Sequence, residues 1–423
     1  MILRRSSTIS ILILCIFLIQ NFLMKLSFIE PGGWVAQIDE LAVLSSVLFF
    51  LLFHKMLIYR IKSLRQPFMM FGAYLLISIV SSIFGVVVLN QFLLQFSLDL
   101  KPFIIIVLLC LCYDDFAVTR FEKLIKAIIL INVPFVLWQF LFSNSYDVIF
   151  ANGSHFGLVY GADGSEYSRA AGAFWFTGIY AVFCSLAIGF FASKLMIEKK
   201  LIAADWGFFF TAILLLFVSL SRGEIVSCLI SCVAVYFFYS GTRYVKPITL
   251  IAVLAVLIVV LILSSAEIEK WLVELGLISG SIDLAPRAIF MQSALDISTD
   301  YFPFGAGLGS FGGRAAVDYD SVFFYKYLIS HEWYFNFGFF LTDTFWPKVI
   351  AESGYIGTFL YFFGFLFFLR KATERKNLSS VYSLFAIVFI LINSLSAPVL
   401  NDAFSIAFVF FLFYGSCLKS ASR

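Results

Sequence analysis

The sequence contains few charged residues. Only 13% of its 423 residues are Asp, Glu, Lys or Arg, whereas 62% are hydrophobic and 19% are aromatic. A soluble domain carries charge on about a quarter of its residues to keep its surface hydrated. This chain cannot cover a soluble surface, so its solvent must be lipid. Its net charge of +3, without a basic tract, gives no reason to expect a nucleic-acid partner.

Cysteine is missing from the segments that we expect outside the membrane. All seven cysteines lie within apolar runs or at their ends. Disulfides are therefore not expected in the outer loops. No metal-ligand spacing is present, so we predict no metal site and interpret the cysteines as small apolar packing residues.

Long apolar runs dominate what remains. A helix of about 20 residues crosses a hydrocarbon core of ~30 Å, and only helices or closed barrels satisfy their backbone there. The pattern predicts an all-α polytopic membrane protein with about twelve transmembrane helices. We place them at residues 8–28, 41–59, 68–89, 93–113, 124–142, 173–193, 206–221, 224–239, 247–264, 350–369, 379–396 and 399–418.

The distribution of Lys and Arg predicts the orientation. Alternate connections between the predicted spans hold 20 of the 29 basic residues, and the other connections are nearly bare or acidic. Because cytoplasmic loops are enriched in Lys and Arg, both termini should face the cytoplasm.

Two connections on the predicted outer side are long. One lies near 143–172, and the other is a large extracytoplasmic loop at 265–349. The chain is thus divided into three parts: residues 1–264 with nine transmembrane helices, 265–349 with the large loop, and 350–423 with three transmembrane helices. Within the loop, Ala266–Leu277 reads as an interfacial amphipathic helix, and Pro286 suits the start of a helix through about Ile297.

Two of the three histidines, His155 and His331, fall in the outer loops. A neutral imidazole can act as a general base near pH 7, although loop histidines are more often structural.

Four arginines lie on the outer side or at a span end: Arg169, Arg222, Arg287 and Arg314. Guanidinium groups bind phosphate bidentately and keep their charge, so a convergent set would suit a lipid diphosphate. The alternative is pairing with carboxylates such as Glu224 or with lipid headgroups.

Four stretches in order resemble the O-antigen polymerase and O-antigen ligase superfamily, which joins lipid-linked polysaccharides in bacteria. They are Ser168–Phe174, Leu220–Gly223, the segment from Arg287 through Tyr301–Gly309, and His331 followed by Ala351–Gly357. The resemblance covers roughly residues 165–370. The chain departs from the usual pattern at Glu332, where Asn often follows the histidine, and at Glu224, where a small residue is common.

The resemblance implies a glycosyltransferase of the bacterial cytoplasmic (inner) membrane, without metal or cofactor. The donor would be an undecaprenyl-diphosphate-linked glycan, and membrane lipid and a chain-length regulator would be further partners. The four arginines would surround the diphosphate. His331, or else His155, would take the acceptor proton, and Glu352 would orient His331 or an arginine. Three loop aromatics would stack on sugars or pack in the core: Trp333, Tyr334 and Trp346.

We expect a polymerase that joins repeat units into O-antigen, capsule or exopolysaccharide. A ligase that moves finished glycan to an acceptor shares the same motifs. A transporter or flippase is the alternative from another class, and it predicts internal repeats and mid-membrane charges. The sequence has no repeat, and only Lys25, Asp99 and Lys101 lie well inside predicted spans.

Overall fold

The computed structural model describes residues 7–26, 28–29, 34–43, 60, 62–150, 158–160, 166–240, 286–327, 329–332, 335 and 341–417. The longer helices are α1 (Ser7–Lys25), α4 (Arg65–Phe84), α5 (Leu89–Cys112), α6 (Ala117–Leu141), α8 (Thr177–Glu198), α9 (Ala203–Val218), α10 (Arg222–Ser240), α13 (Pro286–Asp300), α16 (Trp346–Thr373) and α17 (Leu378–Asn393). The shorter ones are α7 (Ser143–Phe150), α14 (Arg314–Asp318), α15 (Val322–Lys326), α18 (Ala403–Phe410) and α19 (Phe413–Cys417).

Helices dominate the described residues, as predicted, but one small β-hairpin interrupts them. Strand β1 (Leu158–Tyr160) pairs antiparallel with β2 (Glu166–Ser168). The hairpin lies in the first outer connection, immediately before Arg169.

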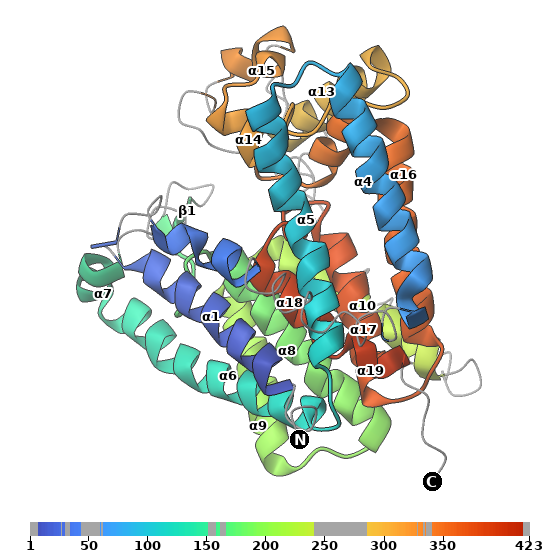
Figure 1. The fold of residues 1–423 in the computed structure, drawn as a ribbon. Coiled ribbons are helices and arrows are strands. Elements are labelled where there is room, and N and C mark those ends of the chain that lie inside the picture. The colour runs from blue at the N-terminus through green and yellow to red at the C-terminus, as the bar shows by residue number, and fades with distance from the viewer. Residues whose placement is uncertain are drawn as a thin grey trace, which may run out of the picture.

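The helices form one bundle with an extension at one end (Figure 1). Helix α8 lies at the centre, packed by α9, α10, α17 and α18. Helices α4, α5 and α16 reach beyond this bundle to α13–α15, and the start of α1 and the end of α19 lie at the opposite end (Figure 1). This arrangement agrees with termini on one side of a membrane and the large loop on the other.

Among the described residues, seven helices are long and apolar enough to cross a membrane, and three apolar helices are shorter. These ten correspond to ten of the predicted spans. The other two, 41–59 and 247–264, lie outside the described residues apart from 41–43, as does the predicted helix 266–277. The total of twelve spans therefore stays a prediction.

Apolar side chains cover the outside of several of these helices, as lipid contact requires. Leu76 of α4, Leu130 of α6 and Leu214 of α9 each expose more than 60% of their surface. Aromatic rings fill the interior, where Phe121 stacks on Phe411 with ring centroids 4.7 Å apart. Water would make such an exterior unfavourable, so the molecule is built for a lipid environment.

Several boundaries differ from the prediction, among them the start of α6, which lies at Ala117 rather than at 124. Helix α16 begins at Trp346 rather than at 350, so Lys348 belongs to the helix and not to the loop. The predicted last span is two helices, α18 and α19, separated by residues 411–412. The predicted span 68–89 ends earlier, at Phe84. The predicted helix from Pro286 is confirmed and continues to Asp300.

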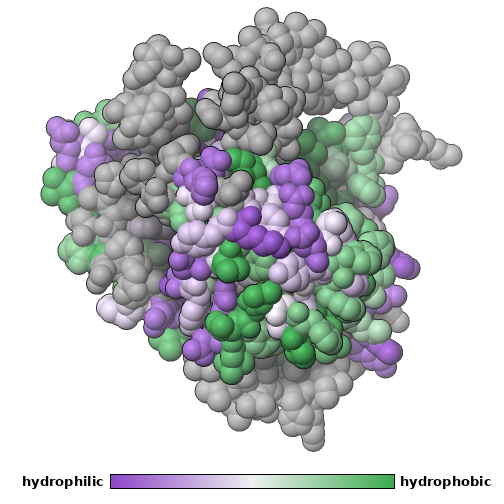
Figure 2. All heavy atoms as spheres, turned by 90° about the horizontal axis from the view of Figure 1, so that it is seen from above, coloured by the Kyte–Doolittle hydropathy of each residue, from purple (hydrophilic) through white to green (hydrophobic). Residues whose placement is uncertain are grey.

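The outer helices have an apolar core of their own. It brings Phe290 of α13 and Phe311 together with Phe323 and Phe324 of α15, all buried. Seen from that end, the described surface mixes hydrophilic and hydrophobic residues (Figure 2). The outer segment is therefore a packed unit seated on α4, α5 and α16.

Candidate functional site

The segment that carries Arg169 is fixed by polar side chains of α6. The Gln139 amide donates to the carbonyl of Arg169 (2.8 Å) and accepts from the Ala171 backbone amide (3.1 Å). Asn132 accepts from the Ala173 amide at 2.9 Å. Because these groups are buried in an apolar bundle, the hydrogen bonds hold the turn in one conformation.

Lys25 completes this support from α1. Its ammonium donates to the carbonyl of Gly172 (2.5 Å), which also accepts from the Tyr146 hydroxyl (2.9 Å). The ammonium lies 5.0 Å from the Tyr146 ring centroid, and only 1% of Lys25 is exposed. Gly172 has φ +53°, a conformation that glycine adopts without strain. The Arg169 segment is thus preorganised by three helices.

Arg169 reaches the hairpin between α9 and α10. Its Nη2 donates to the Ser221 hydroxyl at 2.6 Å, and its Nε donates to the Ser219 carbonyl at 3.3 Å. Arg222 directly follows this hairpin as the first residue of α10, and it is exposed. The stretches Ser168–Phe174 and Leu220–Gly223 are therefore in direct contact.

Arg287 joins them from the start of α13. Its Nη2 lies 2.7 Å from Asp343 Oδ2, and each side chain is 27% exposed. Burial, opposed by Glu224 and reinforced by Arg222 and Arg287, lowers the pKa of Arg169. Burial likewise raises the pKa of Asp343, and Arg287 opposes that shift. We call Arg169, Arg222, Arg287 and the Glu224 carboxylate that acts on two of them the arginine cluster.

Arg314 has a different setting. It begins α14, is 56% exposed, and its Nε lies 3.3 Å from Asp318 on the same helix. Charges that act on Arg169 come from Glu224, Arg222 and Arg287. The structure therefore brings together three of the four predicted arginines.

Glu352 contacts the glycine-rich segment. Its Oε1 accepts hydrogen bonds from the backbone amides of Gly309 (2.8 Å) and Phe311 (3.5 Å), and no part of the residue is exposed. Successive backbone amides of this kind form an anion-binding concavity. The protein's own carboxylate occupies it, so the structure gives Glu352 a supporting contact, and its predicted orientation of His331 or an arginine stays a prediction.

Two glycines allow the glycine-rich segment to pack closely against α16. Gly305 has φ +82°, and Gly354, inside α16, has φ +64°. A Cβ on Gly354 would lie 2.4 Å from the carbonyl oxygen of Pro303, and a Cβ on Gly305 would lie 2.4 Å from the Gly354 nitrogen. The glycine segment and the kink of α16 therefore pack backbone against backbone.

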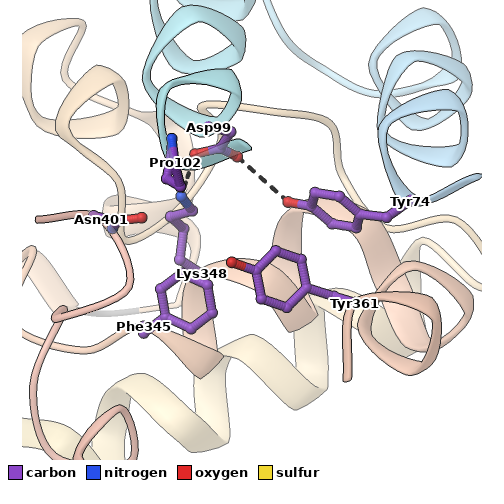
Figure 3. A pocket seen from close by; sticks show the side chains of 7 residues that line it. All are labelled: Tyr74, Asp99, Pro102, Phe345, Lys348, Tyr361 and Asn401. Atoms are coloured by element: carbon purple, nitrogen blue, oxygen red, sulfur yellow. Dashed lines mark hydrogen bonds and ion pairs between the residues drawn. The ribbon is translucent and has the colours of Figure 1, made fainter. Parts of the chain in front are cut away.

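A small pocket, with room for about one water molecule, lies beside this region within the helices (Figure 3). Lys348 and Asp99 point toward each other there, with Nζ 2.5 Å from Oδ1, and the Tyr74 hydroxyl reaches Asp99 at 3.4 Å. A second buried pair, Lys101 and Asp39, also lies 2.5 Å apart. Two of the three mid-membrane charges seen in the sequence, Asp99 and Lys101, are thus in ion pairs. The third, Lys25, donates to the Gly172 carbonyl.

His331 ends a short 3-10 turn, Ile329–His331, and is exposed. Trp346 is 9% exposed and donates to the Ser394 hydroxyl at 2.9 Å, which makes it a packing residue. Three further predicted residues lie outside the described residues: His155, Trp333 and Tyr334. The role of His331 stays a prediction.

The sequence analysis did not identify Asn132 and Gln139, which support the cluster, or Asn393, which lies beside Glu224. Asn132 and Gln139 lie inside an apolar helix, and Asn393 ends another. A polar side chain in a membrane helix is costly unless it has a purpose, so this feature could have identified all three.

Residues 207–362 match the family model of O-antigen ligases. The match includes the hairpin, the start of α13, the glycine segment and the first half of α16, but not Arg169. No curated protein matches the chain. The match confirms the resemblance to the O-antigen ligase and polymerase superfamily and implies a glycan-transferring membrane enzyme.

Proposed function

We propose that this chain, an apolar helical protein with an O-antigen ligase-like region, polymerises undecaprenyl-diphosphate-linked repeat units into O-antigen, capsule or exopolysaccharide. The reaction would take place at the outer face of the bacterial cytoplasmic membrane. The observation that carries the proposal is the arginine cluster. Three segments far apart in the sequence bring guanidinium groups to the start of α10.

The cluster suits the leaving group of glycosyl transfer. A diphosphate diester carries two negative charges, and guanidinium groups bind its oxygens in bidentate fashion. Arg222 lies at the N-terminus of a 19-residue helix, where the helix dipole also favours an anion. Charge developing on the diphosphate as the glycosidic bond breaks would be stabilised by groups already in place. No metal is needed for this role in the proposed mechanism.

The acceptor hydroxyl must also lose a proton as it attacks the anomeric carbon. The sequence-based prediction gives this role to His331, which is exposed on the outer segment. An exposed base would have to approach the cluster with the acceptor.

A ligase is the second candidate, because the matching family model is described as O-antigen ligase. It would use the same cluster and differ only in its acceptor. The transporter hypothesis gains little from the interior charges, because Lys348 and Lys101 each have a carboxylate partner at 2.5 Å.

The glycan profile of a strain that lacks the protein tests the proposal, beside strains that carry His331→Ala or Arg169→Ala. A polymerase predicts glycan that stops at one repeat unit. Long chains that accumulate on the lipid carrier would identify a ligase. A wild-type profile from the deletion strain would refute both, and flipping of lipid-linked glycan by the purified protein would then favour a transporter.

A further inference from the structure

Glu224 occupies a buried position within the arginine cluster. It lies in the first turn of α10 with 8% of its surface exposed, and the charges of Arg169 and Arg287 act on it. Arg169 directs its guanidinium at Ser221, and Arg287 directs its own at Asp343. Within the described part of the chain, no ion pair therefore neutralises the Glu224 carboxylate directly. Because no cation among the described residues pairs with it directly, the Glu224 carboxylate can interact with a bound ligand.

Asn393, at the end of α17, faces the same place. A Cβ on Gly223 would lie 3.8 Å from its Oδ1, and its side chain lies beside Glu224. Asn393 is completely buried and its amide interacts with the Glu224 carboxylate, yet neither its Nδ2 nor its Oδ1 has a partner with full hydrogen-bond geometry among the described residues. The buried Nε of Arg287 also lacks one there.

Buried polar atoms without partners destabilise a folded protein, so their presence needs an explanation. An amide offers one acceptor and two donors, and a hydroxyl offers a donor and acceptors, so the two are complementary. A carboxylate beside the amide adds a proton acceptor. The combination matches a sugar hydroxyl better than a phosphate, because a carboxylate repels an anion.

We propose that Asn393 and Glu224 form the acceptor site, in which Asn393 binds a hydroxyl of the acceptor sugar and Glu224 takes the proton from the attacking one. This inference rests on the proposed glycosyl transfer. The acceptor oxygen forms a bond to the anomeric carbon of the donor sugar. The bond from that carbon to the diphosphate oxygen breaks, and its electron pair leaves with the diphosphate, which the three arginines hold. The hydroxyl proton passes to the Glu224 carboxylate.

This assignment gives Glu224 the role that the sequence suggested for His331. Glu224 lies within the cluster, whereas His331 is exposed on a short turn.

The first test compares Glu224→Gln, Glu224→Asp and His331→Ala in the full-length protein, with a lipid-diphosphate-linked glycan as substrate. A general base contributes about 10²–10⁴-fold, so we expect Glu224→Gln to lower kcat by at least 100-fold with less than a threefold change in the donor KM. Glu224→Asp should retain more activity than Glu224→Gln, and His331→Ala more than either. Glu374→Gln, at the distant end of α16, is the matched control. Loss in His331→Ala with activity retained in Glu224→Gln would overturn the assignment.

The second test uses Asn393→Leu, which removes the unpartnered atoms at similar volume. We expect its melting temperature in detergent to equal or exceed that of the wild type, while the KM for the acceptor glycan rises at least tenfold. Asn377, at the other end of α17, accepts from the Ser380 amide at 2.8 Å. Asn377→Leu should therefore lower the melting temperature and leave the acceptor KM unchanged. An Asn393→Leu protein that melts earlier and keeps its acceptor KM would show a structural role.

Different results would refute the proposed function and the proposed acceptor site. If the wild-type protein forms no glycan bond with any lipid-linked donor, the proposed function fails. If it does, but both Glu224→Gln and Asn393→Leu match the wild type, only the acceptor site is wrong.

Discussion

At the scale of single residues, the planar fork of Arg169 is the feature that positions it. Two of its nitrogens are committed to Ser221 and Ser219, while the charge remains available to the cluster. Lysine has the charge on a single nitrogen and cannot donate from two separate positions as Nε and Nη2 do. Arginine and lysine are therefore not interchangeable at position 169, although both carry a positive charge.

We expect Arg169→Lys to raise the KM for the lipid-diphosphate donor about 10- to 100-fold, because a lost bidentate, charge-assisted contact costs about 1.5–3 kcal/mol. Arg314→Lys provides the control, since Arg314 is 56% exposed and pairs only weakly with Asp318. Steady-state kinetics of both variants in membranes would measure this. A larger effect from Arg314→Lys would place the diphosphate elsewhere.

The arginines could be predicted from the sequence because a guanidinium group binds phosphate wherever it lies in the fold. Polar residues inside apolar helices could have drawn attention to Lys25, Gln139 and Asn132, but not to what they support, because each contacts a backbone carbonyl or amide of a segment more than 25 residues away. Such partners depend on how the helices pack, which apolar periodicity does not specify.

At the scale of elements, the kink of α16 and the glycine segment form one contact. Gly354→Ala would bring a Cβ to 2.4 Å from a backbone oxygen at φ +64°. We expect it to lower stability by at least about 1–2 kcal/mol and to reduce the detergent melting temperature. The loss should exceed the conformational cost alone, because the neighbour is backbone and cannot turn aside.

Gly72, in the middle of α4, is the matched control. A Cβ there meets nothing within 4 Å. Gly72→Ala should be neutral or stabilising by up to about 1 kcal/mol, since alanine favours a helix interior. Equal melting temperatures for the two variants would show that the kink tolerates a side chain.

The pair Lys348–Asp99 connects α16 to α5, with side-chain exposures of 1% and 4%. Lys348→Met should destabilise the protein by about 3–5 kcal/mol, because it leaves Asp99 as an uncompensated buried charge. The double variant Lys348→Met, Asp99→Asn should recover most of that loss. Denaturation in detergent measures both.

Lys326→Met provides the comparison for the same pair chemistry at the surface. Lys326 and Asp300 lie 2.9 Å apart but are about half exposed, so the change should cost about 0–1 kcal/mol. If Lys348→Met reduced the stability as little as Lys326→Met does, the Lys348–Asp99 pair would have to be solvated.

The sequence predicted most helices well, because each is a long apolar run. It misplaced the start of α16 because Lys348 looks like a loop residue until its partner on α5 is known. It treated 399–418 as one span, since the apolar run continues unbroken while the helix does not. Charge and hydropathy thus predict which segments cross the membrane but not where each helix begins.

At the scale of the whole molecule, function depends on which side of the membrane the arginine cluster faces. The ends of α1 and α19 near the termini lie opposite α13–α15 (Figure 1). Loops rich in Lys and Arg then belong to the same side as the termini, as the positive-inside rule requires.

Cysteine labelling with a membrane-impermeant maleimide tests this orientation. Val322 on α15 is 55% exposed, and Glu374 beyond the far end of α16 has a side chain 42% exposed. We expect Val322→Cys to be labelled in intact spheroplasts and Glu374→Cys only after the membrane is opened, each above the background of the seven native cysteines. The reverse pattern would put the arginine cluster in the cytoplasm. Assembled glycan on its lipid carrier would then be out of reach of the cluster, so this single result would also refute the proposed polymerase and ligase reactions.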